Sequence, residues 1–296
     1  MSCTTLPQFI LLLLSLYSLA SFAEVITVTD YKNVEVVLEK PAKRIISLGP
    51  HITENIYTAG AGDLLVGVIA YSDFPIQAKE LPIVGSAQGL SIEKIVSLSP
   101  DLIIAWSSGI SQKTLTSLKA LGIPVYHDEP KTLDDIAQSI LDIGRLTDRK
   151  APSEQAATEF LASLEQLREQ YSDRLPISIF YQIWDKPLMT LSGEHIVSDV
   201  MQLCGGRNSF ADAVVVAPTI SREAVLIRDP DTIISSGLKG QTPNPLASWD
   251  SWPELTAVKN GHLFLMPPDI FQRHSVRLLT AAKVLCEHLE TIRATR

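Results

Sequence analysis

The sequence Ser91-Ile-Glu-Lys-Ile-Val-Ser-Leu-Ser-Pro-Asp-Leu-Ile-Ile104 recurs in the second half of the chain as Ser221-Arg-Glu-Ala-Val-Leu-Ile-Arg-Asp-Pro-Asp-Thr-Ile-Ile234. In both copies a serine that can cap a helix precedes a glutamate, whose charge is favourable in a first helical turn. A Pro-Asp pair then ends the helix, and an Ile-Ile pair indicates a buried strand. The copies lie too far apart for a solenoid repeat. They predict two similar lobes, an arrangement that favours ligand binding between them.

The composition is that of a folded globular protein. Of the 296 residues, 46% are hydrophobic and 20% are charged, which argues against disorder. This length accommodates two modest domains, in agreement with the repeat. The formal net charge of −8 is not offset by any basic cluster, so we expect no binding to nucleic acid or to an anionic membrane.

The N-terminus has the features of an export signal. Residues 9–20 form an apolar run, and Ser21-Phe-Ala23 follows as a small-x-small cleavage pattern. No lysine or arginine precedes the run, and the run is short for a membrane span. We therefore expect residues 1–23 to be a cleaved signal peptide and the mature protein to be soluble, monomeric and periplasmic.

Cysteine usage agrees with export. Cys3 leaves with the signal, and the mature chain keeps Cys204 and Cys286. Two cysteines in an exported protein more often form a disulfide than remain free thiols. We predict a Cys204–Cys286 bridge that attaches the last helix to the second lobe.

Strands and helices alternate over the first half of the chain, which is typical of a parallel α/β sheet. Residues 24–43 alternate between apolar and polar and predict two paired strands. The same criteria predict strands at 44–50, 65–71, 101–106 and 123–128, and helices at 53–60, 91–99, 111–121 and 133–146. In the second half they predict strands at 177–184, 188–191 and 262–266, helices at 195–203 and 276–292, and the repeated helix–strand unit at 221–236.

Residues 151–173 interrupt this rhythm. Pro152 stands near a first helical position, and apolar residues then recur at helical spacing with no strand directly after them. We interpret the segment as a rigid strut, although a long crossover helix within one sheet is an alternative. The predicted fold class is α/β, with two similar Rossmann-like lobes of mostly parallel sheets at 24–148 and 175–296, joined by a single long α-helix within 149–174.

The sequence lacks the motifs of the common enzyme classes. It contains no Gly-x-Ser-x-Gly elbow, no glycine-rich phosphate loop, no His-Glu-x-x-His and no Cys-x-x-Cys. Its six histidines are scattered, with no pair three or four residues apart. We expect no enzyme and no resident cofactor or metal, and a metal site assembled across the lobes stays open as an alternative.

Candidate ligand-binding residues follow three predicted strands, where open α/β sheets bind ligands. They are Tyr71, Trp106 and, within the segment 267–273, Asp269, Phe271 and Arg273. Aromatic rings offer flat apolar faces, and charged side chains can bind polar ligand edges. Core packing or a lid over the sheet is the alternative for each aromatic residue.

Several segments together resemble the periplasmic cobalamin (vitamin B12)-binding proteins of ABC importers. They are Ala70-Tyr-Ser-Asp-Phe-Pro75, Gly85-Ser-Ala-Gln-Gly89, Pro100-Asp-Leu-Ile-Ile-Ala-Trp106, Cys204-Gly-Gly206, Ser221-Arg-Glu223 and Asp269-Ile-Phe-Gln-Arg273. In this order they cover nearly all of the chain after the signal, although the first half also occurs among siderophore- and haem-binding relatives. The resemblance implies a corrinoid bound between two α/β lobes on one long helix and delivered to the permease dimer in the inner membrane.

The resemblance also implies how the protein docks on its permease. Family members use one acidic residue on each lobe to meet permease arginines, and Glu93 and Glu223 occupy those positions. The alternative is that both glutamates only favour their helix dipoles, which is worth about 0.3–1 kcal/mol each.

The ligand site departs from the family pattern at three positions. Ala87 and Ala217 stand where tryptophans are expected, and Thr190 or Leu191 stands where an aromatic residue is expected. Trp184, Trp249 or Phe271 would have to compensate for the lost rings. We therefore predict a periplasmic solute-binding protein for a corrinoid, with vitamin B12 first. An iron chelate (siderophore or haem) is the alternative ligand, and a metal-dependent enzyme on a related two-lobed fold is a weaker alternative.

Overall fold

The computed structural model describes residues 25–238, 240 and 242–296. The signal peptide predicted at residues 1–23 lies outside the described residues. The fold begins with an antiparallel hairpin of β1 (Ile26–Thr29) and β2 (Glu35–Leu38), which confirms the paired strands predicted for this segment. Within the described part of the chain, no helix combines the length and apolar character needed to cross a membrane.

The N-terminal lobe is built on a four-stranded parallel sheet with the order β4-β3-β7-β8. Its strands are β3 (Ile45–Leu48), β4 (Leu65–Val68), β7 (Leu102–Ala105) and β8 (Val125–His127). The helices that cover its two faces are α1 (Pro50–Thr58), α2 (Ile92–Ser97), α3 (Gln112–Ala120) and α4 (Leu133–Thr147). Because both faces are covered, every residue of β3 and β7 is buried.

The C-terminal lobe repeats this plan with a parallel sheet of order β12-β9-β13-β14. Its strands are β9 (Ile177–Gln182), β12 (Gly206–Asn208), β13 (Thr232–Ser236) and β14 (Leu263–Met266). Its helices are α6 (Ile196–Leu203), α7 (Arg222–Arg228), α8 (Thr256–Lys259), α9 (Pro268–Phe271) and α10 (Leu278–Ala294).

Each lobe also carries a short antiparallel hairpin outside its main sheet. In the N-terminal lobe β5 (Gly85–Ser86) pairs with β6 (Gly89–Leu90), and in the C-terminal lobe β10 (Trp184–Asp185) pairs with β11 (Leu188–Met189). The β5–β6 hairpin was not predicted, because two-residue strands show no periodicity, whereas β11 lies within the strand predicted at 188–191.

The repeated sequence forms the same helix–strand unit in both lobes. The Ser91 hydroxyl caps α2 by accepting the Lys94 amide hydrogen, and the Ser221 hydroxyl caps α7 by accepting that of Ala224. The strands that follow, β7 and β13, are central in their sheets. The lobes therefore share a common core unit, as the repeat predicted.

The aspartate of each Pro-Asp pair accepts backbone hydrogen bonds at the neighbouring strand. The Asp101 carboxylate accepts the amide hydrogens of Lys43 and Arg44 at 2.8 and 2.9 Å, directly before β3. In the second lobe the Asp231 carboxylate accepts the Ser178 amide hydrogen at 2.7 Å, within β9. The repeat thus contains both the residues that end the helix and the aspartate that bonds to the neighbouring strand of the sheet.

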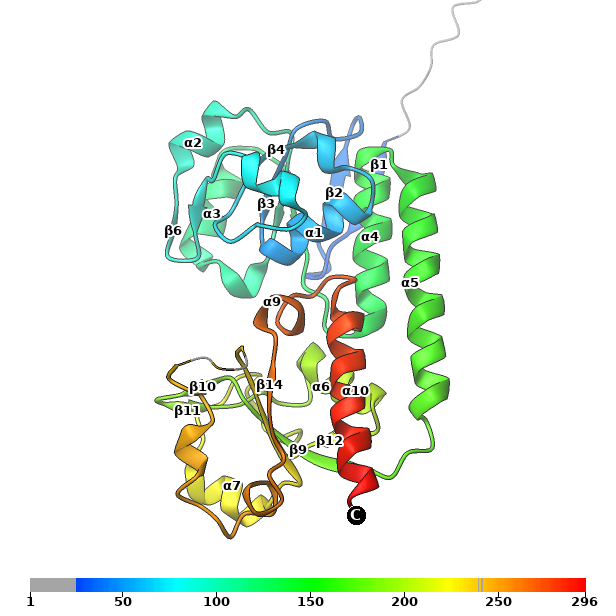
Figure 1. Ribbon diagram of the computed structural model, residues 1–296. Helices are drawn as coiled ribbons and strands as arrows, with labels where there is room; N and C mark the ends of the chain where they lie inside the picture. Colours follow the sequence, from blue (N-terminus) through cyan, green and yellow to red (C-terminus); the bar gives the residue numbers. More distant parts are fainter. Residues whose placement is uncertain (1–24, 239, 241) are drawn as a thin grey trace, which may run out of the picture.

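A single long helix, α5 (Lys150–Tyr171), joins the two lobes and packs along α4 (Figure 1). It buries one apolar stripe, made of Ala157, Phe160, Leu164, Leu167 and Tyr171. Separate sheets precede and follow it, so the alternative of a crossover helix within one sheet is wrong. The predicted fold class is confirmed.

The two lobes share one continuous hydrophobic cluster. It includes Ile52 on α1, Leu164 on α5 and Leu285 on α10, all fully buried. Each lobe has a second cluster on the other face of its sheet. The lobes therefore do not pack as independent bodies on the α5 side.

Two predicted boundaries differ from the structure by three residues. The first helix begins at Pro50, not at residue 53, because proline is favourable in a first helical turn. The strand predicted at 65–71 ends at Val68, since the chain turns at Tyr71, whose φ of 68° lies in the left-handed region.

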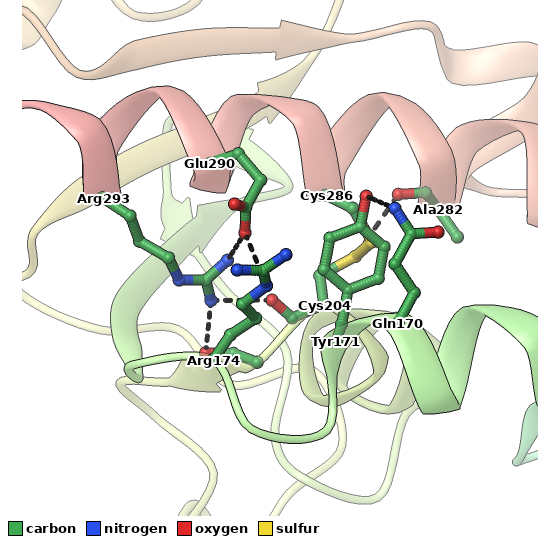
Figure 2. The surroundings of a disulfide bond; sticks show 9 residues. Gln170, Tyr171, Arg174, Cys204, Ala282, Cys286, Glu290 and Arg293 are labelled. Atoms are coloured by element: carbon green, nitrogen blue, oxygen red, sulfur yellow. Dashed lines mark hydrogen bonds and ion pairs between the residues drawn. A yellow bond between two sulfur atoms is a disulfide. The ribbon is translucent and has the colours of Figure 1, made fainter.

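The predicted disulfide joins Cys204, at the end of α6, to Cys286 within α10 (Figure 2). Near it, Arg293 of α10 donates to the carbonyl oxygens of Cys204 and Leu175, each at 2.8 Å, and forms an ion pair with Glu290 at 2.6 Å. The last helix is thus attached to the second lobe both covalently and by hydrogen bonds.

Replacing both cysteines with alanine is expected to lower the free energy of unfolding by about 4 kcal/mol, because the bridge closes a long loop (sequence separation 82). Urea unfolding of the Cys204→Ala/Cys286→Ala variant measures the loss, and reduced wild-type protein is the control. A loss below about 1 kcal/mol would contradict the expectation.

Candidate functional site

The two lobes meet at a buried carboxylate. Glu54, on α1 of the N-terminal lobe, has a side chain that is only 1% exposed. Arg273 and Arg277, from the C-terminal lobe, form ion pairs with its Oε1 at 2.8 and 3.0 Å. The Ser275 hydroxyl donates to its Oε2 at 2.5 Å. Removing one partner of a buried ion pair costs about 3–5 kcal/mol, so this cluster fixes how the lobes meet.

The same arginines hold the turn that carries Tyr71. Arg273 forms an ion pair with Asp73 at 2.7 Å and donates to the Tyr71 carbonyl oxygen at 3.1 Å. Arg277 lies over the Phe74 ring, 4.0 Å from its centroid. Burial raises the pKa of Asp73, but hydrogen bonding and the charge of Arg273 outweigh it and hold this pKa below its usual value. The Tyr71 side chain itself is free and 80% exposed.

Three histidines and Trp106 form an aromatic cluster at the junction. The ring centroid of His274 lies 5.3 Å from those of His51 and His195. Trp106 meets His51 edge-on at 5.3 Å. These residues come from α1, the end of β7, the start of α6 and the segment before α10, so the cluster joins both lobes. Among the described residues, no group of three or more His, Cys, Asp or Glu is arranged to hold a metal ion.

The histidines of this cluster are held neutral. Burial lowers the pKa of His51 to about 3, with a smaller contribution from the charge of Arg273. Burial lowers the pKa of His195 to about 4. For His274, burial and then repulsion from the other two rings hold the pKa well below its usual value. At neutral pH the cluster is therefore an uncharged aromatic surface.

The structure brings four of the five predicted ligand-binding residues to the junction of the lobes. Tyr71 is exposed, Trp106 is half-buried, and Asp269 is exposed with its carboxylate 4.0 Å from Arg273. Arg273 is largely enclosed by its ion pairs, with a side chain that is 12% exposed.

The assignment of Phe271 as a ligand-binding residue must be corrected. Its ring is fully buried and meets Tyr181 edge-on at 5.4 Å, so it belongs to the core and offers no surface to a ligand. Trp249, a possible replacement for a lost wall, is also fully buried and donates to Gln182 at 2.7 Å. Trp184, on β10, is 63% exposed and is the remaining aromatic candidate on the C-terminal lobe.

The positions that depart from the family pattern divide into two kinds. Ala87 is exposed between β5 and β6, and Ala217 is half-buried against the core. Thr190 and Leu191 are buried, and the Thr190 hydroxyl donates to the Tyr181 carbonyl oxygen at 2.7 Å. Of these four positions, only those of the two alanines are not buried.

Sequence reasoning missed the centre of the junction. Glu54, Arg277 and the histidine cluster were not predicted to act together, because their parts lie more than 200 positions apart in the chain. One signal was present: the segment 273–277 holds two arginines, a histidine and a serine with no acidic residue. Such a group requires an acidic partner elsewhere in the fold.

The two repeated glutamates lie far from this junction. Glu93 and Glu223 are exposed in the first turns of α2 and α7. Figure 1 shows these helices on the side of each lobe that faces away from α5. Hydrogen bonds from its own backbone and from Ser221 lower the pKa of Glu223, which keeps this carboxylate charged.

Comparison with known proteins identifies relatives over most of the chain. A family model described as "Periplasmic binding protein" matches residues 45–270. A vitamin B12-binding protein of Vibrio campbellii is 39% identical over 256 residues, which are 86% of this chain and 92% of that protein. A vitamin B12-binding protein of Vibrio cholerae is 42% identical over 250 residues, covering 84% of this chain and 90% of the relative.

Solved structures agree in fold. The periplasmic vitamin B12 binding protein BtuF of Vibrio cholerae superposes with a TM-score of 0.79 at 41% identity, covering 86% of this chain and 98% of that one. The periplasmic heme-binding protein RhuT of Roseiflexus superposes with a TM-score of 0.72 at 23% identity, covering 85% and 99%. At that identity the second likeness concerns the fold alone.

The histidine cluster predicts a loss of stability in mild acid. Unfolded histidine binds a proton near pH 6.5, but the buried rings do not until about pH 4 or below, so the free energy of unfolding falls as the pH drops through this range. Removing one ring by His274→Gln is expected to reduce this slope by up to about 1.4 kcal/mol per pH unit.

Denaturant unfolding of both proteins from pH 8 to pH 4 tests this. Burial raises the pKa of Asp128 to about 7, which acts in the opposite direction, but it is common to both proteins and cancels in their difference. Above pH 7, the free energies of unfolding of wild type and His274→Gln should depend on pH in the same way. Equal slopes below pH 6.5 would refute the assignment.

Proposed function

Because this chain belongs to the periplasmic binding protein family, we propose that it captures a corrinoid, vitamin B12 in the first instance, between its two lobes and delivers it to an ABC-transporter permease. The observation that carries this proposal is the identity of 39% and 42% to vitamin B12-binding proteins over most of both chains. The cycle consists of binding and release in the periplasm, with no chemistry on the ligand.

The proposed ligand face lies between exposed aromatic residues of the two lobes. Tyr71 and Trp106 supply ring faces from the N-terminal lobe, and Trp184 supplies one from the C-terminal lobe. The exposed carboxylate of Asp269 can accept hydrogen bonds from the amide groups at the edge of a corrin ring. A large flat ligand with polar edges suits such a combination of apolar walls and few polar groups.

An iron chelate is the second candidate ligand. The observation that favours it is the small side chain at Ala87 and at Ala217, where the cobalamin pattern has aromatic walls. Each lost ring removes on the order of 150–250 Å² of apolar contact area. Haem or a ferric siderophore would be bound in the same place, so direct comparison of ligands separates the two candidates.

The two lobes are expected to move little on binding. A continuous helix, a shared hydrophobic cluster and the buried Glu54 ion pairs all cross from one lobe to the other. Large closure movements use hinges in loops, whereas each of these three connections is a packed or paired part of the fold.

Titration with cyanocobalamin is expected to show binding with a Kd in the micromolar range or below. Because Tyr71 is exposed and outside the core, Tyr71→Ala is expected to weaken binding by about tenfold without loss of thermal stability. Isothermal titration calorimetry measures the first effect and thermal unfolding the second.

Haem and a ferric siderophore are titrated in parallel, with Tyr31→Phe as a control that changes a tyrosine outside the set of proposed ligand-binding residues. If cyanocobalamin fails to bind while one of the iron chelates binds, the corrinoid assignment is wrong and the second candidate replaces it.

We further infer that Glu93 and Glu223 dock the protein on its permease dimer. One exposed glutamate stands at the same point of each lobe, two residues after a capping serine. Paired carboxylates on separate lobes match a partner that presents the same basic site twice, and such charges mainly raise the association rate and fix orientation. Stabilising the helix dipole requires neither exposure nor a matched pair.

The double charge reversal Glu93→Arg/Glu223→Arg is expected to abolish uptake of labelled cyanocobalamin in cells and to leave its Kd unchanged. The matched control is Glu169→Arg/Glu287→Arg, which reverses two other exposed glutamates. Intact uptake by the Glu93/Glu223 variant would exclude docking at these positions.

A further inference from the structure

We propose that the permease dimer also contacts exposed apolar side chains beside the two docking glutamates, above all Val96 on α2 and Ile227 on α7. Each docking contact combines a carboxylate, which steers the encounter, with an apolar anchor, which slows dissociation. The inference rests on the docking part of the proposed function, because it names further residues of that same surface.

An exposed apolar side chain follows each docking glutamate on the same helix. Val96 stands three residues after Glu93, and Ile227 stands four residues after Glu223. Residues at these spacings share one face of a helix. Val96 is 48% exposed and Ile227 is 85% exposed, so neither side chain is enclosed by its own lobe.

Other residues form the buried side of both helices. Ile95 of α2 and Val225 of α7 are fully buried, and each stands two residues after the glutamate of its copy of the repeat. Two residues correspond to slightly more than half a helical turn, so the glutamates lie on the side away from the core. The apolar residues that share this side are therefore available to a partner.

A neighbouring segment adds to the apolar surface beside α2. The carbonyl oxygen of Val84 accepts the amide hydrogen of Ser91, the residue that caps α2, at 2.8 Å. The adjoining Ile83 is 53% exposed. Exposed apolar side chains thus stand both before and after Glu93.

Three successive exposed valines, 214–216, lie in the segment beside the end of α7. Their side chains are 98%, 62% and 45% exposed. Asp212, two residues before them, forms an ion pair with Arg228 of α7 at 3.0 Å, which holds this segment next to the helix. A run of exposed apolar residues is unfavourable in water and is typical of a surface that a partner covers.

The basic side chains of α7 are neutralised within their own lobe. Arg222 pairs with Asp185 at 2.8 Å, and Arg228 pairs with Asp212. Glu223 therefore supplies the unbalanced charge of this helix. A carboxylate beside apolar side chains matches a basic protein surface with apolar surroundings. Because α2 and α7 present this combination once on each lobe (Figure 1), it fits a partner that offers the same surface twice, as a permease dimer does.

Dissociation kinetics test this proposal. The permease dimer of the host cell is reconstituted in lipid nanodiscs, and binding of the protein to it is followed by biolayer interferometry. We expect Val96→Ser/Ile227→Ser to raise the dissociation rate by about tenfold, and to do so equally at about 1 M salt, because apolar contacts are not screened. Glu93→Arg/Glu223→Arg is expected to lower mainly the association rate, and most strongly at low salt.

The matched control is Val25→Ser/Val37→Ser. It removes two valines that are 56% and 51% exposed on or next to the β1–β2 hairpin, which Figure 1 shows on the α5 side of the N-terminal lobe. Both rate constants should stay at their wild-type values in this control. The Kd for cyanocobalamin and the thermal stability should be unchanged in Val96→Ser/Ile227→Ser.

An unchanged dissociation rate of Val96→Ser/Ile227→Ser refutes the proposal, even where charge reversal shows that the glutamates dock the protein. Faster dissociation without any effect of charge reversal removes the glutamates from the docking surface and keeps the apolar contact. If wild type does not bind the permease, docking and this proposal fail together.

Two further results assign these side chains to another occupant and overturn the proposal. A higher Kd for cyanocobalamin in Val96→Ser/Ile227→Ser, with unchanged dissociation from the permease, assigns them to the ligand. A wild-type dimer that this variant separates, measured by size-exclusion chromatography with light scattering, assigns them to a second copy of the chain.

Discussion

The carboxylate of Glu54 is buried where the two lobes meet, and its charge has to be balanced by groups from the opposite lobe. Arg273, Arg277 and Ser275 provide that balance. A buried charge without partners is strongly unfavourable, so the lobes are constrained to the one arrangement that brings these groups together. The long helix α5 and the shared hydrophobic cluster act in the same direction. A helix, a hydrophobic cluster and buried ion pairs thus all connect the two lobes.

The surface proposed for the ligand follows from this junction. The arginines that neutralise Glu54 also fix the turn of Tyr71, and the three neutral histidines place an uncharged aromatic cluster around Trp106. Groups that hold the lobes together and groups proposed to face the ligand are therefore direct neighbours. The proposed docking glutamates stand apart from them on α2 and α7, where both carboxylates are exposed. Ligand binding and docking are thus separated in space on each lobe.

The repeat has a structural role that is independent of docking. Asp101 and Asp231 each accept amide hydrogens from the chain at the adjacent strand, which aligns the two central strands of each sheet. Among the residues that the structure describes, the glutamates of the repeat have no such partner from another element. Within one short motif, the aspartate therefore stabilises the sheet, and the glutamate is exposed on the surface.

The two-lobed α/β architecture, the long joining helix and the disulfide could be predicted from the sequence, because hydrophobic periodicity, helix caps and an isolated cysteine pair are local or compositional signals. It also pointed to the exposed Tyr71 and the half-buried Trp106 as candidate ligand-binding residues. The sequence did not show which aromatic residues are buried: Phe271 and Trp249 are aromatic like Tyr71, yet they pack into the core. Only the tertiary structure decided which polar groups meet, because the distance between Glu54 and Arg273 depends on how the lobes pack together. The same residue types can bind a ligand or hold two lobes together, and the sequence alone does not show that Arg273 pairs with Glu54.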